Sequence, residues 1–206
     1  LVSEQGRVRA EITDFWAMVF NPTSVDRLVH VLLGALLAGA FFVISVAAWY
    51  RLKGQHREAA QKMMRLGIGF ATVAILAQWF SGHRSAELVA EYQPAKLAAM
   101  EGHFETGAAN LYALGWVDAQ NQKVYGIGLP GGLSFLLNGN FEGRVAGLNA
   151  FAREDQPKAV NAIFQFYHIM VGSAGLMTLL AFLGLWALWT QRWEDAPWWT
   201  RILVFS

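Results

Sequence analysis

The sequence predicts an all-α membrane protein with about three complete transmembrane helices, the start of a fourth, and a long extracytoplasmic loop. Three observations lead to this fold class. Of the 206 residues, 55% are hydrophobic and only 15% are charged, whereas a soluble domain usually carries about 25% charged residues. Several long runs contain no Asp, Glu, Lys or Arg. A short, strongly basic segment separates the first two of these runs, as is typical of a cytoplasmic connection between transmembrane helices.

The uncharged runs define the individual spans. Residues 28–50 and 66–82 contain no formal charge, and a helix needs about 20 residues to cross the hydrocarbon core. Residues 159–191 are also uncharged, and we expect 169–189 to form the third crossing. The last residues, "TRILVFS", open a fourth apolar run. Because the chain begins at Leu1 and stops within that run, we expect either a fragment of a longer subunit or a naturally split subunit.

The distribution of basic residues predicts the orientation. The segment "RLKGQHREAAQKMMR" at 51–65 has five Lys or Arg against one acid, and short loops this basic stay in the cytoplasm. The sequence therefore divides into a lead-in at 1–27, a helix pair with its basic loop at 28–82, an extracytoplasmic loop at 83–158, and the third span with the start of a fourth at 159–206.

Composition also excludes several classes of function. The chain has no cysteine, so disulfides, iron–sulfur clusters, thiolate zinc sites and covalent c-type haem attachment are ruled out for it. A formal net charge of +1 gives no indication of a nucleic-acid partner. The lipid bilayer is the partner that the composition predicts.

A histidine and a methionine are expected at one depth of the membrane. His30 lies near the outer end of the first span and Met170 near the outer end of the third. Small residues follow each at helical spacing: Gly34 and Ala38 after His30, and Ser173 and Ala174 after Met170. Such residues leave room for a flat cofactor, and His with Met is an axial pair for haem iron. The alternatives are an interfacial histidine that is only hydrogen-bonded and a methionine that only fills space.

The other histidines are less specific. His168 is two residues from Met170 and points to another helix face, where it could contact a haem propionate, cap the helix or face water. His56, in the basic loop, is expected to be solvated. His83 and His103 belong to the outer loop, and their roles stay open.

The stretch "QPAKLAAMEGHFET" at 93–106 reads as a short helix with charged residues. Lys96 and Glu101 are five residues apart, whereas Glu101 and Glu105 are four apart and share a face. Such a pattern is usually a solvated surface. The glycine-rich "GIGLPGG" at 126–132 lacks the strand-then-helix setting of a phosphate loop and is interpreted as a turn.

Several long motifs, in order, resemble subunit I of the cytochrome bd quinol oxidases. "NPTSVDRLVHVLLGALLAGAFFVISVAAWYRLKG" is similar to the span of that subunit whose His ligates the low-spin haem b. "GHRSAELVAEYQPAKLAAMEGHFET" resembles the start of the quinol-binding loop. "LPGGLSFLLNGNFEGRVAGLNAFAREDQP" and "FQFYHIMVG" resemble the remainder in members with a short loop.

This resemblance implies roles for four residues. His30 and Met170 would ligate a non-covalent, low-spin haem b, and Lys96 and Glu101 would form the pair that binds and deprotonates quinol. A carboxylate can accept a proton from a quinol hydroxyl, while a lysine can hold a ring oxygen. Many members have Arg where this chain has His168. The choice between ubiquinol and menaquinol stays open.

The resemblance also implies partners and a location. Only the central part of the subunit is matched, so further haems would be carried by missing parts of subunit I or by other membrane subunits, beside a subunit II-like partner. The complex would lie in the bacterial cytoplasmic membrane. Two alternatives are an electron-transfer subunit of a bd-like complex that does not itself reduce oxygen, and a haem-free structural membrane subunit.

Overall fold

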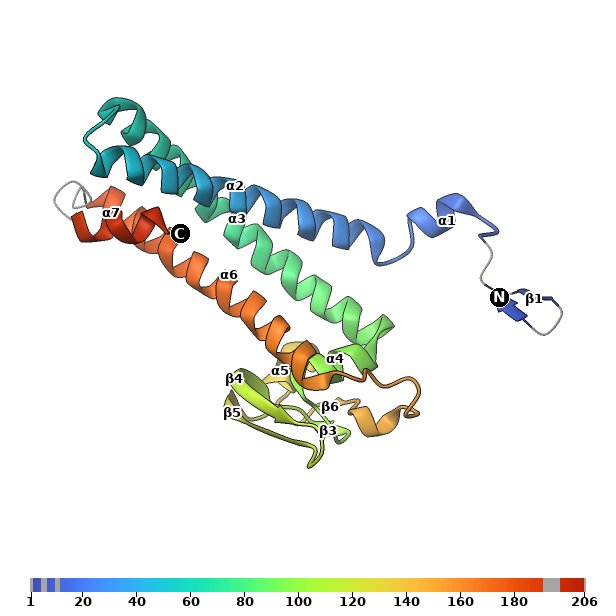
Figure 1. The fold of residues 1–206 in the computed structure, drawn as a ribbon. Coiled ribbons are helices and arrows are strands. Elements are labelled where there is room, and N and C mark those ends of the chain that lie inside the picture. The colour runs from blue at the N-terminus through green and yellow to red at the C-terminus, as the bar shows by residue number, and fades with distance from the viewer. Residues whose placement is uncertain (1, 5–6, 10–11, 191–196, 206) are drawn as a thin grey trace.

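Three long helices dominate the fold, with a small mixed region at one end of them (Figure 1). The computed structural model describes residues 2–4, 7–9, 12–190 and 197–205. The helices α2 (Ser24–Leu52), α3 (Arg57–Tyr92) and α6 (Val160–Trp189) are each long and apolar enough to cross a bilayer. The predicted three complete spans are therefore confirmed. Helices α2 and α3 extend beyond their uncharged runs, since α2 begins before Asp26 and α3 runs past Arg84, whereas α6 lies within its run.

The helices pack through small residues. The core between α2 and α3 combines alanines with larger side chains, among them Phe41, Ile44 and Ile75. A β-carbon added at Gly67 of α3 would lie 2.8 Å from Ile44 Cγ1 of α2, so glycine permits the close approach of these two backbones. Small residues at such contacts are typical of membrane helices.

Short elements also lie at both ends of the chain. The N-terminal part holds a hairpin of β1 (Val2–Glu4) and β2 (Arg7–Arg9), followed by α1 (Phe15–Val19). The predicted start of a fourth span corresponds to α7 (Pro197–Val204), which packs on α2. There Ser45 Oγ donates a 2.6 Å hydrogen bond to the carbonyl of Val204. Residues 191–196 and 206, at the borders of that predicted segment, lie outside the described residues.

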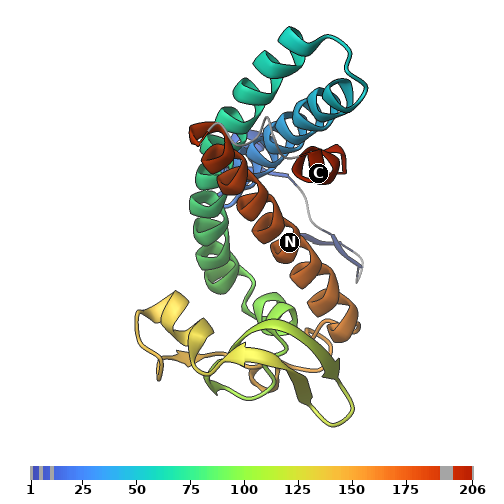
Figure 2. The ribbon, with the colours of Figure 1, turned by 90° about the vertical axis from the view of Figure 1, so that its left-hand side faces the viewer.

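The region between α3 and α6 combines short helices with short strands (Figure 2). Its elements are α4 (Pro94–Glu101), β3 (Gly107–Ala108), β4 (Leu111–Asp118), β5 (Lys123–Leu129), α5 (Gly132–Asn138), β6 (Arg144–Val145) and the 3-10 helix η1 (Leu148–Ala150). Strands β4 and β5 form an antiparallel hairpin, and β3 pairs with β6. The helix predicted around Lys96 is confirmed by α4. The interpretation of 126–132 as a turn is wrong for its first half, which continues β5.

Helix α4 follows α3 after a single residue. Gln93 ends α3 and precedes Pro94 at the first position of α4, where proline is favoured because no backbone N–H is needed. Helix α4 ends at Gly102, whose φ of 63° suits glycine. A β-carbon there would lie 2.6 Å from Val124 Cγ2 of β5, so this glycine also lets the hairpin lie against the end of α4.

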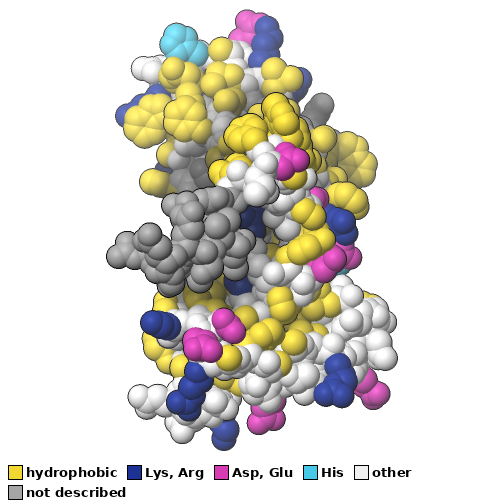
Figure 3. All heavy atoms as spheres, turned by 90° about the vertical axis from the view of Figure 1, so that its right-hand side faces the viewer, with side chains coloured by type: hydrophobic (Ala, Val, Ile, Leu, Met, Phe, Trp, Pro, Cys, Tyr) yellow, Lys and Arg dark blue, Asp and Glu magenta, His cyan; other side chains and the backbone are white. Residues whose placement is uncertain are grey.

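The surface changes character along the molecule. On the face drawn in Figure 3, hydrophobic side chains cover much of the helical part and charged side chains gather along the end formed by residues 93–159. The exposed side of the long helices carries large apolar residues, including Leu32, Phe42, Leu66, Phe80 and Leu179. Lipid tails are the environment in which such a surface is stable.

Candidate functional site

One cavity of about 340 Å³ lies where α2, α3, α4 and α6 meet the loop region. Most of its lining is apolar, from Leu97, Met100 and Val171 among others. Both residues that the sequence placed at one depth, His30 of α2 and Met170 of α6, line this cavity. The structure thus brings these two candidates to a common space, although 140 residues of chain separate them.

The ring of His30 is held by polar side chains of α3. Its Nδ1 lies 3.2 Å from Ser81 Oγ. Gln78 Nε2 lies 3.0 Å from the Nε2 atom and 3.3 Å from the Nδ1 atom of the same ring. The buried Oε1 of Gln78 has no hydrogen-bond partner. Nδ1–H can donate to Ser81, as the second ring nitrogen of a metal-binding histidine often does, while Nε2 contacts the Gln78 amide.

The donor set fits a haem better than a bare ion. Among the described residues, no group of three or more His, Cys, Asp or Glu side chains is arranged to hold a metal. A haem supplies four nitrogen donors itself and needs only axial ligands from the protein. One imidazole and one thioether, from His30 and Met170, lie on the wall of the apolar cavity and are donors of the kind that a haem uses.

Glu101 is a buried carboxylate beside this cavity. It is 1% exposed at the end of α4. The side chain of Tyr167, which lines the cavity from α6, hydrogen-bonds to it. Its Oε2 atom has no hydrogen-bond partner. Burial raises the pKa of Glu101 from 4.5 to about 7, and the Tyr167 hydrogen bond limits this rise. Such a carboxyl can hold or release a proton near neutral pH.

Lys96 lies apart from Glu101. The side chain is exposed on α4, and five residues of helix turn it about 140° away from the buried carboxylate. It is also not a lining residue of the cavity that holds His30 and Met170. The structure therefore brings three of the four predicted site residues to one region and leaves Lys96 on the outer side of the same helix.

His168 is held by contacts with the backbone and with a neighbouring ring. It is buried, with Nδ1 2.8 Å from the carbonyl oxygen of Phe164 and Nε2 3.0 Å from that of Tyr112. Its ring stacks on Phe164, with centroids 3.8 Å apart. Of the three open interpretations, exposure to water is thus wrong. These contacts tie the beginning of α6 to strand β4.

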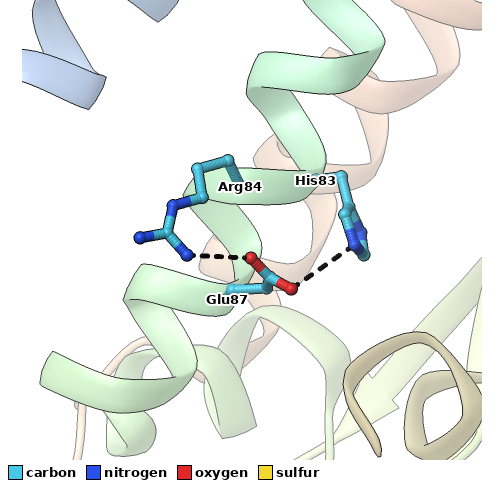
Figure 4. Close-up of polar contacts among 3 residues, drawn as sticks. All are labelled: His83, Arg84 and Glu87. Carbon is cyan, nitrogen blue, oxygen red and sulfur yellow. Dashed lines mark hydrogen bonds and ion pairs between the residues drawn. The ribbon is translucent and has the colours of Figure 1, made fainter. Parts of the chain in front are cut away.

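The remaining histidines differ in surroundings. His83 lines the cavity and lies 3.5 Å from Glu87, which also pairs with Arg84 at 3.2 Å (Figure 4). His103 Nε2 contacts the carbonyl of Val145 at 3.1 Å, and burial lowers its pKa. His56 is exposed in the basic loop, as expected.

Sequence reasoning did not single out Tyr167, Gln78 or Ser81. Gln78 and Ser81 lie within the second uncharged run, and their spacing of three residues puts them on one face of α3. That spacing was the available signal. For Tyr167 no local pattern exists, because its partner Glu101 belongs to another helix.

Fold and cavity together define a helical membrane protein with an apolar cavity near one end of its spans. The chain belongs to the cytochrome bd terminal oxidase subunit I family, whose sequence model matches residues 1–206. It is 35% identical over 97% of its length to the putative cytochrome bd menaquinol oxidase subunit I of Bacillus subtilis (strain 168). It is 34% identical over 95% of its length to the cytochrome bd ubiquinol oxidase subunit 1 of the same organism.

A solved structure shares the fold. The bd oxidase from Geobacillus thermodenitrificans superposes with a TM-score of 0.84 over 93% of this chain, at 30% sequence identity. The chain spans less than half of these proteins, namely 46% and 44% of the two Bacillus relatives and 44% of the Geobacillus chain.

Proposed function

We propose that this chain is the quinol-oxidising, low-spin haem b-binding part of a cytochrome bd-type oxidase. A single observation carries the proposal. His30 and Met170 line one apolar cavity, and Tyr167 on the wall of that cavity hydrogen-bonds to the buried Glu101. Family membership supports the reaction class, since the curated relatives are named as menaquinol and ubiquinol oxidase subunits.

In this proposal His30, through Nε2, and Met170, through its thioether, would hold the haem. When bound, the haem supplies one-electron transfer between quinol and further haems. Ser81 Oγ accepts a hydrogen bond from Nδ1–H and fixes the imidazole ring. Gln78 must turn its amide away from Nε2 before the haem can bind there.

Glu101 accepts a proton from the substrate. Oxidation of a quinol to a quinone releases two protons and two electrons, so a base must lie within hydrogen-bond reach of a quinol hydroxyl. A carboxylate with a pKa of about 7 is deprotonated in a large fraction of molecules at neutral pH and regains its proton readily. Lys96, on the exposed side of α4, attracts the substrate at the loop surface rather than contacting Glu101 directly.

The reaction takes place on the outer side of the bacterial cytoplasmic membrane. The basic residues between α2 and α3, such as Arg51 and Lys53, favour the cytoplasm for that end. The loop region, Glu101 and the proposed haem lie at the opposite end. Protons released there leave outward, which contributes to the proton gradient without pumping.

Electrons continue to haems outside this chain. The chain covers less than half of its relatives, so the remaining part of subunit I, or other membrane subunits, would carry those haems beside a subunit II-like partner. The oxygen-reducing site belongs to that remainder.

Quinol-driven haem reduction in the purified complex tests this function. We expect a reduced-minus-oxidised spectrum with a low-spin b-type band and its rapid appearance after a quinol analogue is mixed in by stopped flow. Substituting Glu101→Gln should slow this appearance and leave the dithionite-reduced band unchanged. A complex without haem, or one in which quinol reduces the haem equally fast in both forms, would contradict the proposal.

A further inference from the structure

The β4–β5 hairpin carries an exposed apolar face. Its cross-strand pairs Leu114 with Ile127 and Trp116 with Tyr125, and directly opposed residues project from the same side of a sheet. All four are strongly exposed, at 69%, 75%, 61% and 60%. Leu129 extends this side of the hairpin and is 55% exposed. None of the five is charged, and monomeric proteins rarely keep such a contiguous patch in water without a use.

The other side of the hairpin is packed, so the exposed side is fixed. Val117 is buried against Phe164 and its neighbours. Gly115 lies so close to α6 that a β-carbon there would meet Phe164 Cζ at 3.3 Å. Because side chains alternate along a strand, a shift of register would turn these packed residues outward. The apolar face is therefore a stable feature of this fold.

Hydrogen bonds from α6 define the depth of the hairpin. Asn161 accepts a bond from the backbone N–H of Val117, and Gln165 donates to the carbonyl of Gly115. One turn further along α6, His168 contacts the carbonyl of Tyr112. Strand β4 thus follows the first turns of α6, over about 10 Å of helix, immediately before the segment that crosses the bilayer.

Polarity along the hairpin matches this depth. The connection farthest from the span, at 119–122, is polar and lies between Asp118 and Lys123. Trp116 and Tyr125 come next, and Leu114, Ile127 and Leu129 lie at the end nearest the span. Trp and Tyr are enriched at the level of lipid headgroups, with aliphatic residues below them. The interfacial zone is about 5–8 Å thick on each side of the hydrocarbon core, comparable to the length over which β4 follows α6.

The patch also continues an apolar surface that faces lipid. Phe166 and Ile169, on the exposed side of α6 at the same level, are 74% and 62% exposed. In Figure 2 the hairpin lies at the lower end of α6, with a broad face turned outward from the bundle. The exposed face of the hairpin and that of α6 together would extend the lipid-facing surface of the spans.

From this we propose that the face formed by Leu114, Trp116, Tyr125, Ile127 and Leu129 inserts into the headgroup region of the leaflet at the N-terminal end of α6. The hairpin then anchors the loop region to the membrane surface. Its partner is the lipid itself, and the proposal does not depend on haem or quinol binding.

Spin labels on the assembled complex test this anchor. The chain has no cysteine, so Ile127→Cys gives one labelling position in it, provided that the other subunits carry no reactive thiol. A nitroxide at this position is examined in lipid nanodiscs by its accessibility to oxygen, which concentrates in lipid, and to a water-soluble nickel chelate. Gln120→Cys in the polar connection is the water-exposed control, and Phe80→Cys on α3 is the lipid-exposed control.

We expect the oxygen-to-nickel accessibility ratio at Ile127 to be several-fold larger than at Gln120 and to approach that at Phe80. A ratio equal to that at Gln120 would mean that the face lies in water. Low accessibility to both reagents would mean that protein covers it, such as another part of the subunit. Either of these two results overturns the proposal.

Discussion

Tyr167 of α6 and Glu101 of α4 are hydrogen-bonded to each other, and this contact joins the loop region to the wall of the cavity that holds His30 and Met170. The carboxylate is buried and the tyrosine is its polar neighbour on the cavity side. A proton and an electron leaving a quinol here would have acceptors within one small region.

The two proposed axial ligands should have separable effects on the spectrum. We expect His30→Ala to abolish the low-spin b band, because the variant lacks the proposed imidazole ligand. Met170→Leu should leave a high-spin or altered haem, since the imidazole remains. The measurement is the reduced-minus-oxidised absorbance spectrum of the purified complex. Met177→Leu, which changes a packing methionine on the same helix, is the control and should have a normal spectrum.

Titration of Glu101 should control the rate of quinol oxidation. Its pKa is about 7, and only the deprotonated form accepts a proton, so the stopped-flow rate should rise with pH through about this value. Glu101→Gln should remove that dependence and slow the reaction about 100-fold or more, as expected for the loss of a general base. A flat wild-type profile between about pH 5.5 and 8.5 would count against this role.

The same pKa shift predicts how stability depends on pH. The pKa of Glu101 is raised on folding, so the folded protein favours the protonated carboxyl. The contribution of this group to the free energy of unfolding is therefore fully present below about pH 4.5 and is lost as pH rises through about 7. The cost of keeping the buried carboxylate ionised is on the order of 3 kcal/mol. Thermal unfolding of wild type and Glu101→Gln should therefore diverge towards high pH, with the variant more stable. If the unfolding temperature changed by the same amount in both proteins between about pH 5 and 8, this prediction would be wrong.

Tyr167 should position Glu101 and lower its pKa. Tyr167→Phe removes a hydrogen bond that favours the ionised carboxylate, so the pH profile of quinol oxidation should move to higher pH. The haem spectrum should stay unchanged, because the tyrosine is not a proposed ligand. Tyr125→Phe, on the exposed side of β5, is the matched control. If both variants keep the wild-type profile, Tyr167 is only a packing residue.

Lys96 should act on apparent substrate affinity. Its side chain is exposed and lies on a different side of α4 from the Glu101 carboxylate. Lys96→Ala should therefore raise the apparent KM for quinol roughly three- to tenfold with little change in kcat. Lys158→Ala, another exposed lysine of the loop region, is expected to have no effect. A fall in kcat as large as that of Glu101→Gln would instead assign Lys96 to the chemical step.

The sequence was sufficient for those features that depend on local patterns. Uncharged runs predicted the three spans, and the stretch at 93–106 was interpreted as a short helix, which α4 confirms for its first part. The positions of His30 and Met170 near the outer ends of their spans predicted that they lie at one depth of the membrane. Helix ends were less predictable, because α2 and α3 continue through charged residues such as Arg27 and Arg84 once they leave the hydrocarbon core.

Long-range contacts explain what was missed. The β4–β5 hairpin was not predicted, because Gly115, Gly126 and Gly128 make its strands read as irregular. Those glycines are explained by packing, as at Gly115 against Phe164. The surroundings of Lys96 and Glu101 were also not evident, since burial of one end of α4 depends on α6, which begins far along the chain.

The direct passage of α3 into α4 sets a constraint on length. Gln78 and Ser81, which hold His30, and Glu101 belong to one nearly continuous helical segment with Gln93 as its only joint. One extra residue inserted in α3 after Ser81 would rotate everything that follows by about 100° and advance it by about 1.5 Å. Glu101 would then leave Tyr167. Insertions and deletions should therefore be rare between these positions during evolution, whereas the hairpin connection at 119–122 has no such restriction.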